Sequence, residues 1–351
     1  MDRIARQVGV STMTVSRILR GQNQPVYRKA RERARRVLEI AERLNYRPNA
    51  AAKAVVSGKF HCATLLLSPV DGEGEMCTLM PGIVDGICAG LAERDYHLNI
   101  AHLSSSQVVD KSLPKVLREK MTDGLLVNYY SAIPRRQMEL IELYEIPSVY
   151  INMRHQADCV FPDDFDAAKR GAERLIEVGH RRILYLRNVP QPHYSATDRR
   201  EGYLAAMKAR GLEPLVVEID SFSDSQQERL DAVFSRPDRP TAVLGYCDQA
   251  SEFMLSVAAG LGLKVPGDIS LMHFAEDCMV AGIRMGNIVL PWYQIGKVAA
   301  QELLAKIDTP PLRFSPRAIM VRSIEDWATV APPRQARPKQ TRGQMKASSR
   351  K

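Results

Sequence analysis

From residue 61 onward, short β-rich runs alternate with longer stretches whose apolar residues recur at helical spacing. The expected strands lie at 63–67, 97–102, 124–128, 148–152, 183–186, 215–219, 242–246 and 269–273. The expected helices lie at 79–95, 135–145, 164–178, 198–210, 224–235, 248–261 and 292–306. Strand–helix alternation of this kind produces parallel sheets that are covered by helices on both faces. Because so many units fall within about 270 residues, we expect two such sheets.

Residues 4–19 carry a different pattern, which predicts a helix, a tight turn and a second helix. Gly9 suits the turn because glycine adopts positive φ at little cost. Ser11 is a natural N-cap for the second helix, and Gly21 is a natural stop after it. An apolar seam at helical spacing joins the two helices and consists of Val8, Val10, Val15, Ile18 and Leu19.

The second of these helices has an outer face without an acidic residue. That face carries Thr12, Met13, Thr14, Ser16, Arg17 and Arg20. A short helix with an apolar back and a neutral-to-basic front fits the major groove of DNA. The alternative interpretation is a small helical hairpin within an ordinary core.

A third helix is expected at 27–44, with an arginine-rich outer face. Its expected apolar stripe is Ala30, Ala34, Val37, Leu38, Ala41 and Leu44. Pro48 ends this region, and Asn49 is placed to cap a short alanine-rich helix that stops near Gly58. Such a helix is too short to be stable alone, and a plain linker is the alternative.

Charge divides the chain into a basic head and an acidic body. Residues 1–60 hold 14 Lys and Arg against 4 Asp and Glu, whereas residues 61–331 have a net charge of −8. This division favours a polyanion-binding module joined to a module with another task. The proline- and arginine-rich segment 332–351 holds 7 basic residues and no acid, and we expect it to be disordered.

Other classes of protein lack support in the sequence. There is no 18-residue apolar run and no signal peptide, so we expect a cytoplasmic protein with no membrane partner. The six cysteines form no C-x-x-C motif, and the seven histidines show no metal-ligand spacing. Two G-x-G runs, at 72–74 and 260–262, lack the third glycine of a dinucleotide loop. We therefore expect no enzyme activity, no metal and no cofactor.

Ligands of open parallel sheets bind beyond the carboxyl ends of the strands, so residues that follow strands are candidates for a ligand site. Asp163-Asp164 follow the run 159–161, and Asp248 follows the strand expected at 242–246. Arg199 lies in the run 195–203, which follows another expected strand. Each carboxylate could instead be a helix N-cap.

The N-terminal region resembles the DNA-binding headpiece of the lactose-repressor (LacI/GalR) family. The matching pieces are I-A-x-x-x-G-V-S-x-x-T-V-S-R-I-L at 4–19, L-N-Y-R-P-N at 44–49 and A-K-A-V at 52–55. The resemblance implies that the second helix enters the major groove. It also implies that the segment 49–56 is a hinge helix that forms on DNA, pairs with its dimer mate and inserts an apolar side chain into the minor groove.

By this resemblance, Thr12, Met13 and Arg17 are the expected base-reading side chains, with Arg17 paired to guanine. Thr14, Ser16 and Asn23 are expected to hold phosphates. The remaining expected DNA-binding residues are Ser11 at the start of the recognition helix and, in the hinge, Asn49, Ala52, Lys53 and Val55. Val55 replaces the usual leucine and Lys53 the usual arginine, so the wedge in the minor groove is expected to be shallower.

The body, roughly 61–330, is similar to the same family's type I periplasmic-binding-protein fold of two α/β lobes around a cleft. Matching pieces include G-H-R-R-I at 179–183, S-A-x-x-R-x-x-G-Y at 195–203 and V-P-G-D-I-S at 265–270. The resemblance implies that Asp163, Arg199 and Asp248 line the cleft and bind an effector. Trp292 could stack on a sugar ring there or belong to the core. The usual G-F-D-D appears here as His273-Phe274-Ala275-Glu276, so the effector cannot be named.

Together these features predict an all-α helix-turn-helix headpiece joined to an α/β body of two parallel-sheet lobes. We expect a headpiece (1–47), a hinge helix and linker (48–60), a two-lobed effector-binding and dimerisation domain (61–331) and a basic tail (332–351). The expected function is a transcriptional repressor that binds a palindromic operator in double-stranded DNA as a homodimer, under control of a sugar-like effector. The alternatives are a purine or other non-sugar effector, or a sugar-binding protein without specific DNA readout.

Overall fold

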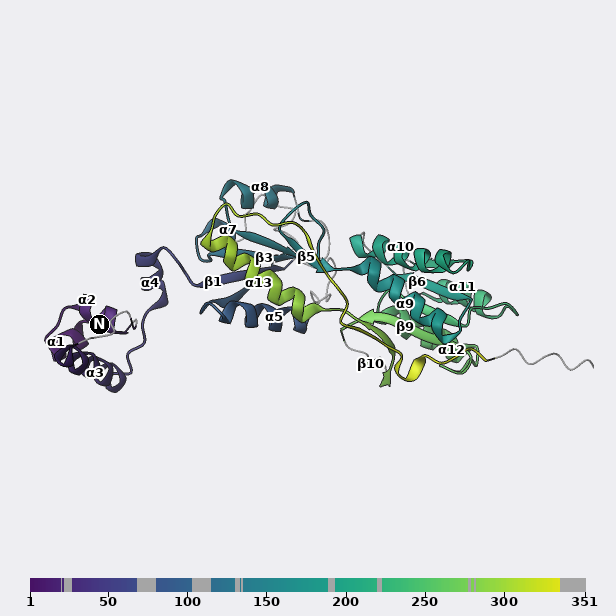
Figure 1. The fold of residues 1–351 in the computed structure, drawn as a ribbon, viewed down its shortest axis with the longest axis horizontal. Helices are drawn as coiled ribbons and strands as arrows, with labels where there is room; N and C mark the ends of the chain where they lie inside the picture. The colour runs from purple at the N-terminus through teal and green to yellow at the C-terminus, as the bar shows by residue number, and fades with distance from the viewer. Residues whose placement is uncertain are drawn as a thin grey trace, which may run out of the picture. The chain divides into compact units, whose positions relative to one another are not determined.

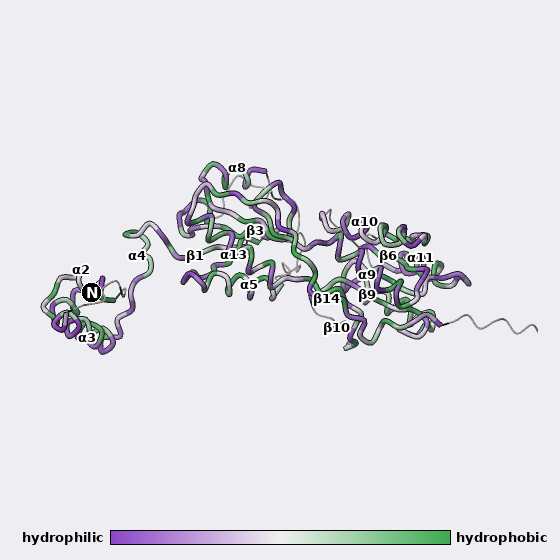
Figure 2. The backbone as a smooth tube through the Cα atoms, in the orientation of Figure 1, coloured by the Kyte–Doolittle hydropathy of each residue, from purple (hydrophilic) through white to green (hydrophobic). Residues whose placement is uncertain are grey.

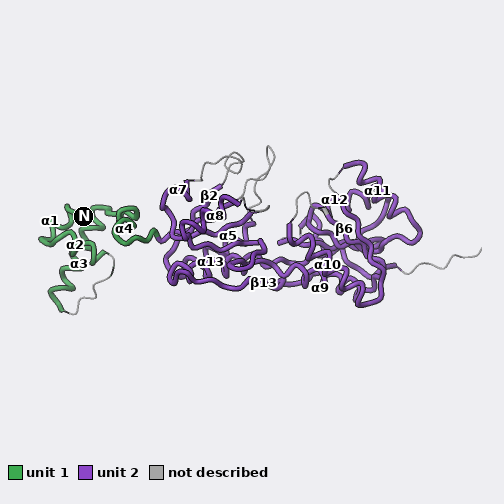
Figure 3. Tube along the Cα trace, turned by 90° about the horizontal axis from the view of Figure 1, so that it is seen from above, with its two compact units in different colours: residues 1–60 green, residues 61–351 purple. Residues whose placement is uncertain are grey.

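The computed structural model describes residues 1–19, 21, 27–67, 80–102, 115–129, 133, 135–188, 193–219, 223–276, 279–280 and 282–334. The chain forms two compact units, residues 1–60 and residues 61–351, which Figure 3 colours separately. No helix in the described part is long and apolar enough to cross a membrane.

The first unit is a small helical unit. Its helices are α1 (Asp2–Val8), α2 (Thr12–Leu19), α3 (Arg28–Arg43) and α4 (Ala50–Ser57). Helices α1, α2 and α3 share one apolar cluster, which includes Ile4, Val15, Val37 and Ile40. Apolar and hydrophilic residues alternate along α3 in Figure 2, so only one side of this helix joins the core. The seam of the helix-turn-helix is confirmed, whereas Leu38 is exposed and Ile40 takes the buried place expected for it.

The second unit contains two six-stranded sheets. Lobe 1 has the strand order β13-β5-β4-β3-β1-β2, and all its neighbouring strands run parallel. Its strands are β1 (Cys62–Leu67), β2 (His97–His102), β3 (Gly124–Asn128), β4 (Ser148–Ile151), β5 (Cys159–Pro162) and β13 (Arg317–Ile319). Its helices are α5 (Pro81–Ala92), α7 (Lys115–Arg118), α8 (Arg135–Leu143) and α13 (Trp292–Asp308).

Lobe 2 has the strand order β14-β12-β9-β8-β6-β7, with only the β12–β14 pair antiparallel. Its strands are β6 (Ile183–Asn188), β7 (Leu215–Ile219), β8 (Ala242–Gly245), β9 (Ser270–Ala275), β12 (Gly286–Val289) and β14 (Ser323–Glu325). Its helices are α9 (Asp164–Val178), α10 (Tyr194–Ala209), α11 (Asp224–Phe234) and α12 (Asp248–Gly260). A hairpin of β10 (Met279–Val280) and β11 (Ile283–Arg284) and the 3-10 turn η1 (Trp327–Thr329) complete the lobe.

Apolar residues cover both faces of each sheet, which explains the nearly continuous apolar runs of the strands. In lobe 1, α5 and α13 cover one face, while residues of α7 and α8 pack on the other (Figure 1). In lobe 2, α9 and α10 cover one face and α11 and α12 the other. The chain passes between the lobes after β5, after β12 and after β13, because β13 returns to lobe 1 before β14 joins lobe 2.

The expected helices and strands of the body are present, with a few shifted ends. Helix α10 begins at Tyr194 rather than 198, because the His193 side chain caps it by accepting the Ser195 N–H at 3.4 Å. The strand β5 was anticipated only as the run 159–161 ahead of Asp163, and the short strands β10 to β14 were not expected. Residues 335–351 lie outside the described part, so the disorder expected for the tail stays a prediction.

Candidate functional site

The outward face of α2 is the first candidate site. Val15 is fully buried and Ile18 nearly so, while Met13 is 65% exposed and Thr12 and Arg17 are also exposed. No acidic residue lies in this helix. The packing of α2 against α1 and α3 therefore fixes the helix from behind and presents a neutral-to-basic front.

The start of α2 is capped as expected. The Thr14 N–H donates to Ser11 Oγ at 3.2 Å, and the Ser11 and Thr14 hydroxyls share a hydrogen bond of 2.9 Å. Gly9 takes a left-handed φ of 77° at the turn. Thr14 and Ser16 are half-buried at the edge of the face. Asn23 lies outside the described residues, so its expected phosphate contact stays a prediction.

The short helix α4 forms as expected, with caps at both ends. The Ala52 N–H donates to Asn49 Oδ1 at 3.1 Å, and Gly58 ends the helix with a φ of 71°. Val55 is 86% exposed, and Ala52 is exposed beside it. The exposed apolar side chain of Val55 is therefore available to contact an apolar partner. The Lys53 side chain lies outside the described part of the structure.

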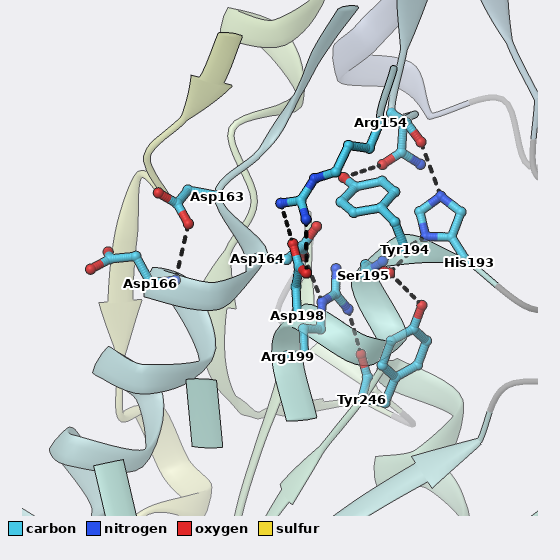
Figure 4. Close-up of polar contacts among 11 residues, drawn as sticks. Arg154, Asp163, Asp164, Asp166, His193, Tyr194, Ser195, Asp198, Arg199 and Tyr246 are labelled. Atoms are coloured by element: carbon cyan, nitrogen blue, oxygen red, sulfur yellow. Dashed lines mark hydrogen bonds and ion pairs between the residues drawn. The ribbon is translucent and has the colours of Figure 1, made fainter. Parts of the chain in front are cut away.

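The second candidate site lies where β4, α9, α10 and β8 converge in the second unit, and Figure 4 shows its polar residues. Of the expected effector residues, only Arg199 occupies its centre. Asp163 is the N-cap of α9, because its Oδ1 accepts the Asp166 N–H at 3.0 Å. Asp248 is exposed in the first turn of α12, and its Oδ1 accepts the Gln249 N–H at 2.9 Å. Trp292 is buried in the hydrophobic core, which fits its alternative interpretation.

Arg199 is held by Asp164, the neighbour of the expected Asp163. Its Nε donates to Asp164 Oδ1 at 2.7 Å, and its Nη1 donates to the Tyr246 carbonyl oxygen at 2.6 Å. The guanidinium also lies 4.7 Å from the Tyr246 ring centre and 4.3 Å from that of Phe274. Both side chains of the ion pair are buried. Arg199 is thus engaged by a carboxylate, a carbonyl and two aromatic rings of its own chain.

A second arginine pair joins the two lobes. Arg154, which follows β4 of lobe 1, donates from Nη1 and Nη2 to the two oxygens of Asp198 on α10, at 3.1 and 2.5 Å. The Arg154 guanidinium lies 5.3 Å from the Phe161 ring centre and 5.4 Å from that of Tyr194. Burial raises the pKa of Asp198, and the nearby charges of Asp164 and Asp163 raise it further, whereas Arg154 lowers it. Three carboxylates therefore sit close enough to act on one another.

A chain of hydrogen bonds runs through the same region. His193 Nε2 contacts the Asn152 carbonyl oxygen at 2.9 Å, and His193 Nδ1 contacts Ser195 Oγ at 2.7 Å. Ser195 Oγ in turn contacts the Tyr246 hydroxyl at 2.7 Å. Burial lowers the pKa of His193, so the neutral ring is favoured. These contacts connect the end of β4 in lobe 1 to the end of β8 in lobe 2.

Sequence reasoning missed Arg154, His193, Asp198 and Tyr246 as members of this site, and it assigned the effector role to Asp163 rather than to Asp164. The positions of two of them indicated a ligand site, because Tyr246 ends an expected strand and Arg154 lies two residues beyond another. Asp164 stands beside the expected Asp163, and sequence alone does not decide which of two adjacent acids turns inward. No cluster of three or more metal-ligating side chains occurs among the described residues.

Comparison with known proteins finds a matching family for each of the two units. Residues 1–49 match the family described as bacterial regulatory proteins, lacI family, and residues 172–325 match a periplasmic binding protein-like domain. The chain therefore carries a lacI-family headpiece and a periplasmic binding protein-like body. Its headpiece is therefore a DNA-binding domain, and its two-lobed body is an effector-binding domain.

Relatives span nearly the whole chain. Catabolite control protein A of Priestia megaterium is 28% identical over 310 residues, covering 86% of this chain and 90% of that protein. The transcriptional repressor PurR of Edwardsiella ictaluri is 26% identical over 338 residues, covering 92% of this chain and 96% of that protein. These relatives are regulators, which confirms the expectation that the chain is not an enzyme.

Solved structures share the fold. A Lac repressor dimer bound to operator and the anti-inducer ONPF superposes with a TM-score of 0.73 at 19% identity, covering 93% of this chain and 98% of that chain. A complex of the regulator CelR with cellobiose superposes with a TM-score of 0.63 at 23% identity, covering 92% and 98%. The expected lac-repressor-like fold is confirmed.

Proposed function

We propose that this lacI-family regulator is a cytoplasmic repressor that binds a palindromic operator as a homodimer. The observation that carries the proposal is the face of α2, which is acid-free, exposed at Thr12, Met13 and Arg17, and fixed from behind by a buried seam. One helix of eight residues reads too few base pairs for useful specificity. Two copies on a two-fold site supply the rest.

Within the headpiece, each side chain is assigned one task. Thr12, Met13 and Arg17 read base edges, with Arg17 donating bidentately to guanine. Ser11, Thr14, Ser16 and Asn23 hold phosphates, and these contacts set the position of the helix on the duplex. The hinge residues belong to helix α4 and its N-cap. Asn49, Ala52 and Lys53 contact the DNA backbone, while Val55 enters the minor groove.

The body controls this binding through an effector in the site of Figure 4. A sugar-like ligand is the first candidate, because hydroxyl groups suit a site of carboxylate and guanidinium groups, and a purine is the second. Arg199, Asp248 and Asp163 are assigned to effector binding, and Asp163 also caps α9 through its Oδ1. An effector that binds one lobe arrangement more tightly shifts the population of hinge helices that can pair on DNA.

The test is selection of binding sites from a random-sequence duplex pool with the purified full chain. Recovery of a palindrome with half-sites about one helical turn apart supports the dimeric reader. Binding that is tight, indifferent to sequence and steeply dependent on salt would overturn it, because such binding needs only the basic charge of the headpiece. The same experiment with Val55→Ala tests the hinge, since loss of the wedge lowers affinity for the palindrome.

A further inference from the structure

The site between the lobes holds more acidic than basic groups, and both of its basic groups are already paired. Arg154 has both terminal nitrogens on Asp198, and Arg199 has Asp164 on one side and the Tyr246 carbonyl on another. The rings of Tyr246 and Phe274 also lie close to the Arg199 guanidinium. The charge of each arginine is therefore already balanced by a carboxylate of the protein, which weakens the attraction of either one for an anionic ligand.

The carboxylates have capacity left over. We call Asp163, Asp164 and Asp198 the carboxylate cluster. Asp164 Oδ2 is buried and has no hydrogen-bond partner among the described residues, although its Oδ1 is used by Arg199. Asp163 forms no ion pair with any described residue, and only its Oδ1 is engaged, by a backbone N–H. A buried carboxylate oxygen without a donor is costly, so it is satisfied when a ligand supplies that donor.

The charge of Asp164 reaches the whole site. It raises the pKa of Asp198 and of Tyr194, and it partly offsets the burial that lowers the pKa of His193. Asp163 also acts on Asp198. Three carboxylates against two guanidiniums leave one negative charge in excess among these five groups, in a region where burial weakens the screening by water.

We propose that the effector of this chain carries a positively charged nitrogen, such as a primary ammonium group, and that the carboxylate cluster binds it. This inference rests on the proposed effector site, and it narrows the ligand to amine-bearing molecules such as amino sugars or polyamines. Phosphorylated sugars and sugar acids are expected to bind more weakly than amine-bearing molecules of the same size. The ammonium group would donate to Asp164 Oδ2, the buried oxygen without a partner, and its charge would offset the excess negative charge.

The test uses matched probes that differ only in charge. Glucosamine, glucose and glucuronate form one set, and putrescine, 1,4-butanediol and succinate form another. Binding to the full chain is measured by calorimetry and by the shift of the melting temperature. We expect a cationic probe to bind at least about tenfold more tightly than the other two members of its set, which is the gain from a single charge-assisted hydrogen bond. The inference is overturned if the neutral or anionic member of a set binds most tightly, or if neither cationic probe binds.

Two variants with opposite effects check the residues. Asp198→Asn keeps the side-chain shape, lowers the negative charge and frees Arg154, so it should weaken the cationic probe about tenfold. Arg154→Gln removes a cation and should strengthen it. Asp224→Asn, on the exposed start of α11, is the matched control and should change nothing. If all three variants bind the cationic probe as the unmodified chain does, the carboxylate cluster is not its site.

The outcome is separable from that of the proposed function. If the chain selects a palindrome but prefers the anionic probe, the proposed operator binding stands and the proposal of a cationic effector is wrong. Binding of the cationic probe without selection of any palindrome supports the ligand site and rejects the operator.

Discussion

Arg17 projects from the exposed face of α2, with no acidic residue on the same helix. We predict that Arg17→Ala costs about 1–3 kcal/mol on the selected operator, because a bidentate contact to guanine is lost. Weak, salt-sensitive binding to a scrambled duplex should persist. Fluorescence anisotropy on both duplexes measures this difference. Arg33→Ala on the exposed side of α3 is the control and should lower both affinities equally. Full operator preference in Arg17→Ala would mean that another helix reads the bases.

The adjacent residues Asp163 and Asp164 should differ sharply when they are replaced. Asp164→Ala leaves the guanidinium of Arg199 buried without its counter-ion, which costs about 3–5 kcal/mol of unfolding free energy. Asp163→Ala removes only an N-cap contact and costs about 1 kcal/mol. Urea unfolding of the two variants gives both values. Equal losses would show that the buried pair is no more important than the cap.

The same two residues show what sequence can decide at this scale. That an acid follows a strand and begins a helix is readable from the run 159–164, as is the cap of α2 at Ser11. Which acid turns inward depends on Arg199, which lies 35 positions later and reaches Asp164 only through the packing of α10 on α9. Likewise, Trp292 follows a strand, but its packing in the core cannot be read from its neighbours.

At the scale of elements, α5 and α13 approach each other closely at a glycine. A Cβ placed on Gly86 would lie 2.0 Å from the carbonyl oxygen of Tyr293 in α13, a backbone atom that cannot move aside alone. We predict that Gly86→Ala lowers the unfolding free energy by about 2–4 kcal/mol, because the helices must separate.

Thermal and urea unfolding followed by circular dichroism measure this effect. Gly260→Ala in α12 is the matched control, since its nearest neighbour would be the flexible end of Gln227 at 3.7 Å. That control should be neutral or slightly stabilising. A stability of Gly86→Ala equal to that of the control would mean that the two helices tolerate a wider spacing.

Most helices and strands are predictable from the sequence because each has its own periodicity. The exceptions have physical reasons. The strand β13 has three residues and pairs with β5, more than 150 positions earlier, so local sequence holds no trace of the pairing. Leu38 looks like part of the apolar stripe of α3, yet α1 and α2 cover the side of Val37, Ile40 and Ala41 instead.

At the scale of the whole molecule, two buried histidines make stability depend on pH. Burial lowers the pKa of His180 and of His273 to about 4. His180 is hydrogen-bonded to Thr241 and Ser270, whereas neither ring nitrogen of His273 has a partner within the described ranges. The unfolded chain therefore binds more protons than the folded chain between pH 4 and about 6.5, and acidification through this window favours unfolding.

Each histidine should contribute up to about 3 kcal/mol to that loss, which is complete below pH 4 and absent above pH 7. Urea unfolding at several pH values between 4.5 and 7.5 measures it. His273→Gln should reduce the slope, while His97→Gln, on the exposed strand β2, should leave it unchanged. A slope that is the same in both variants would contradict the assignment to His273.

The fold class was predictable at this scale because alternating strands and helices leave few arrangements. The interleaving of the lobes, in which the chain crosses between them three times, was not predictable. It depends on which sheet the short strands β13 and β14 join.

That interleaving has a consequence for how the protein is made. A ribosome releases lobe 1 up to β5, then most of lobe 2, and only afterwards α13 and β13, which finish lobe 1. Until residue 292 has emerged, the side of α5 that receives α13 has no cover, and the nascent chain carries that apolar surface through most of translation. Lobe 1 is therefore begun first and completed nearly last, so a chain that stops before β13 lacks a strand of each lobe.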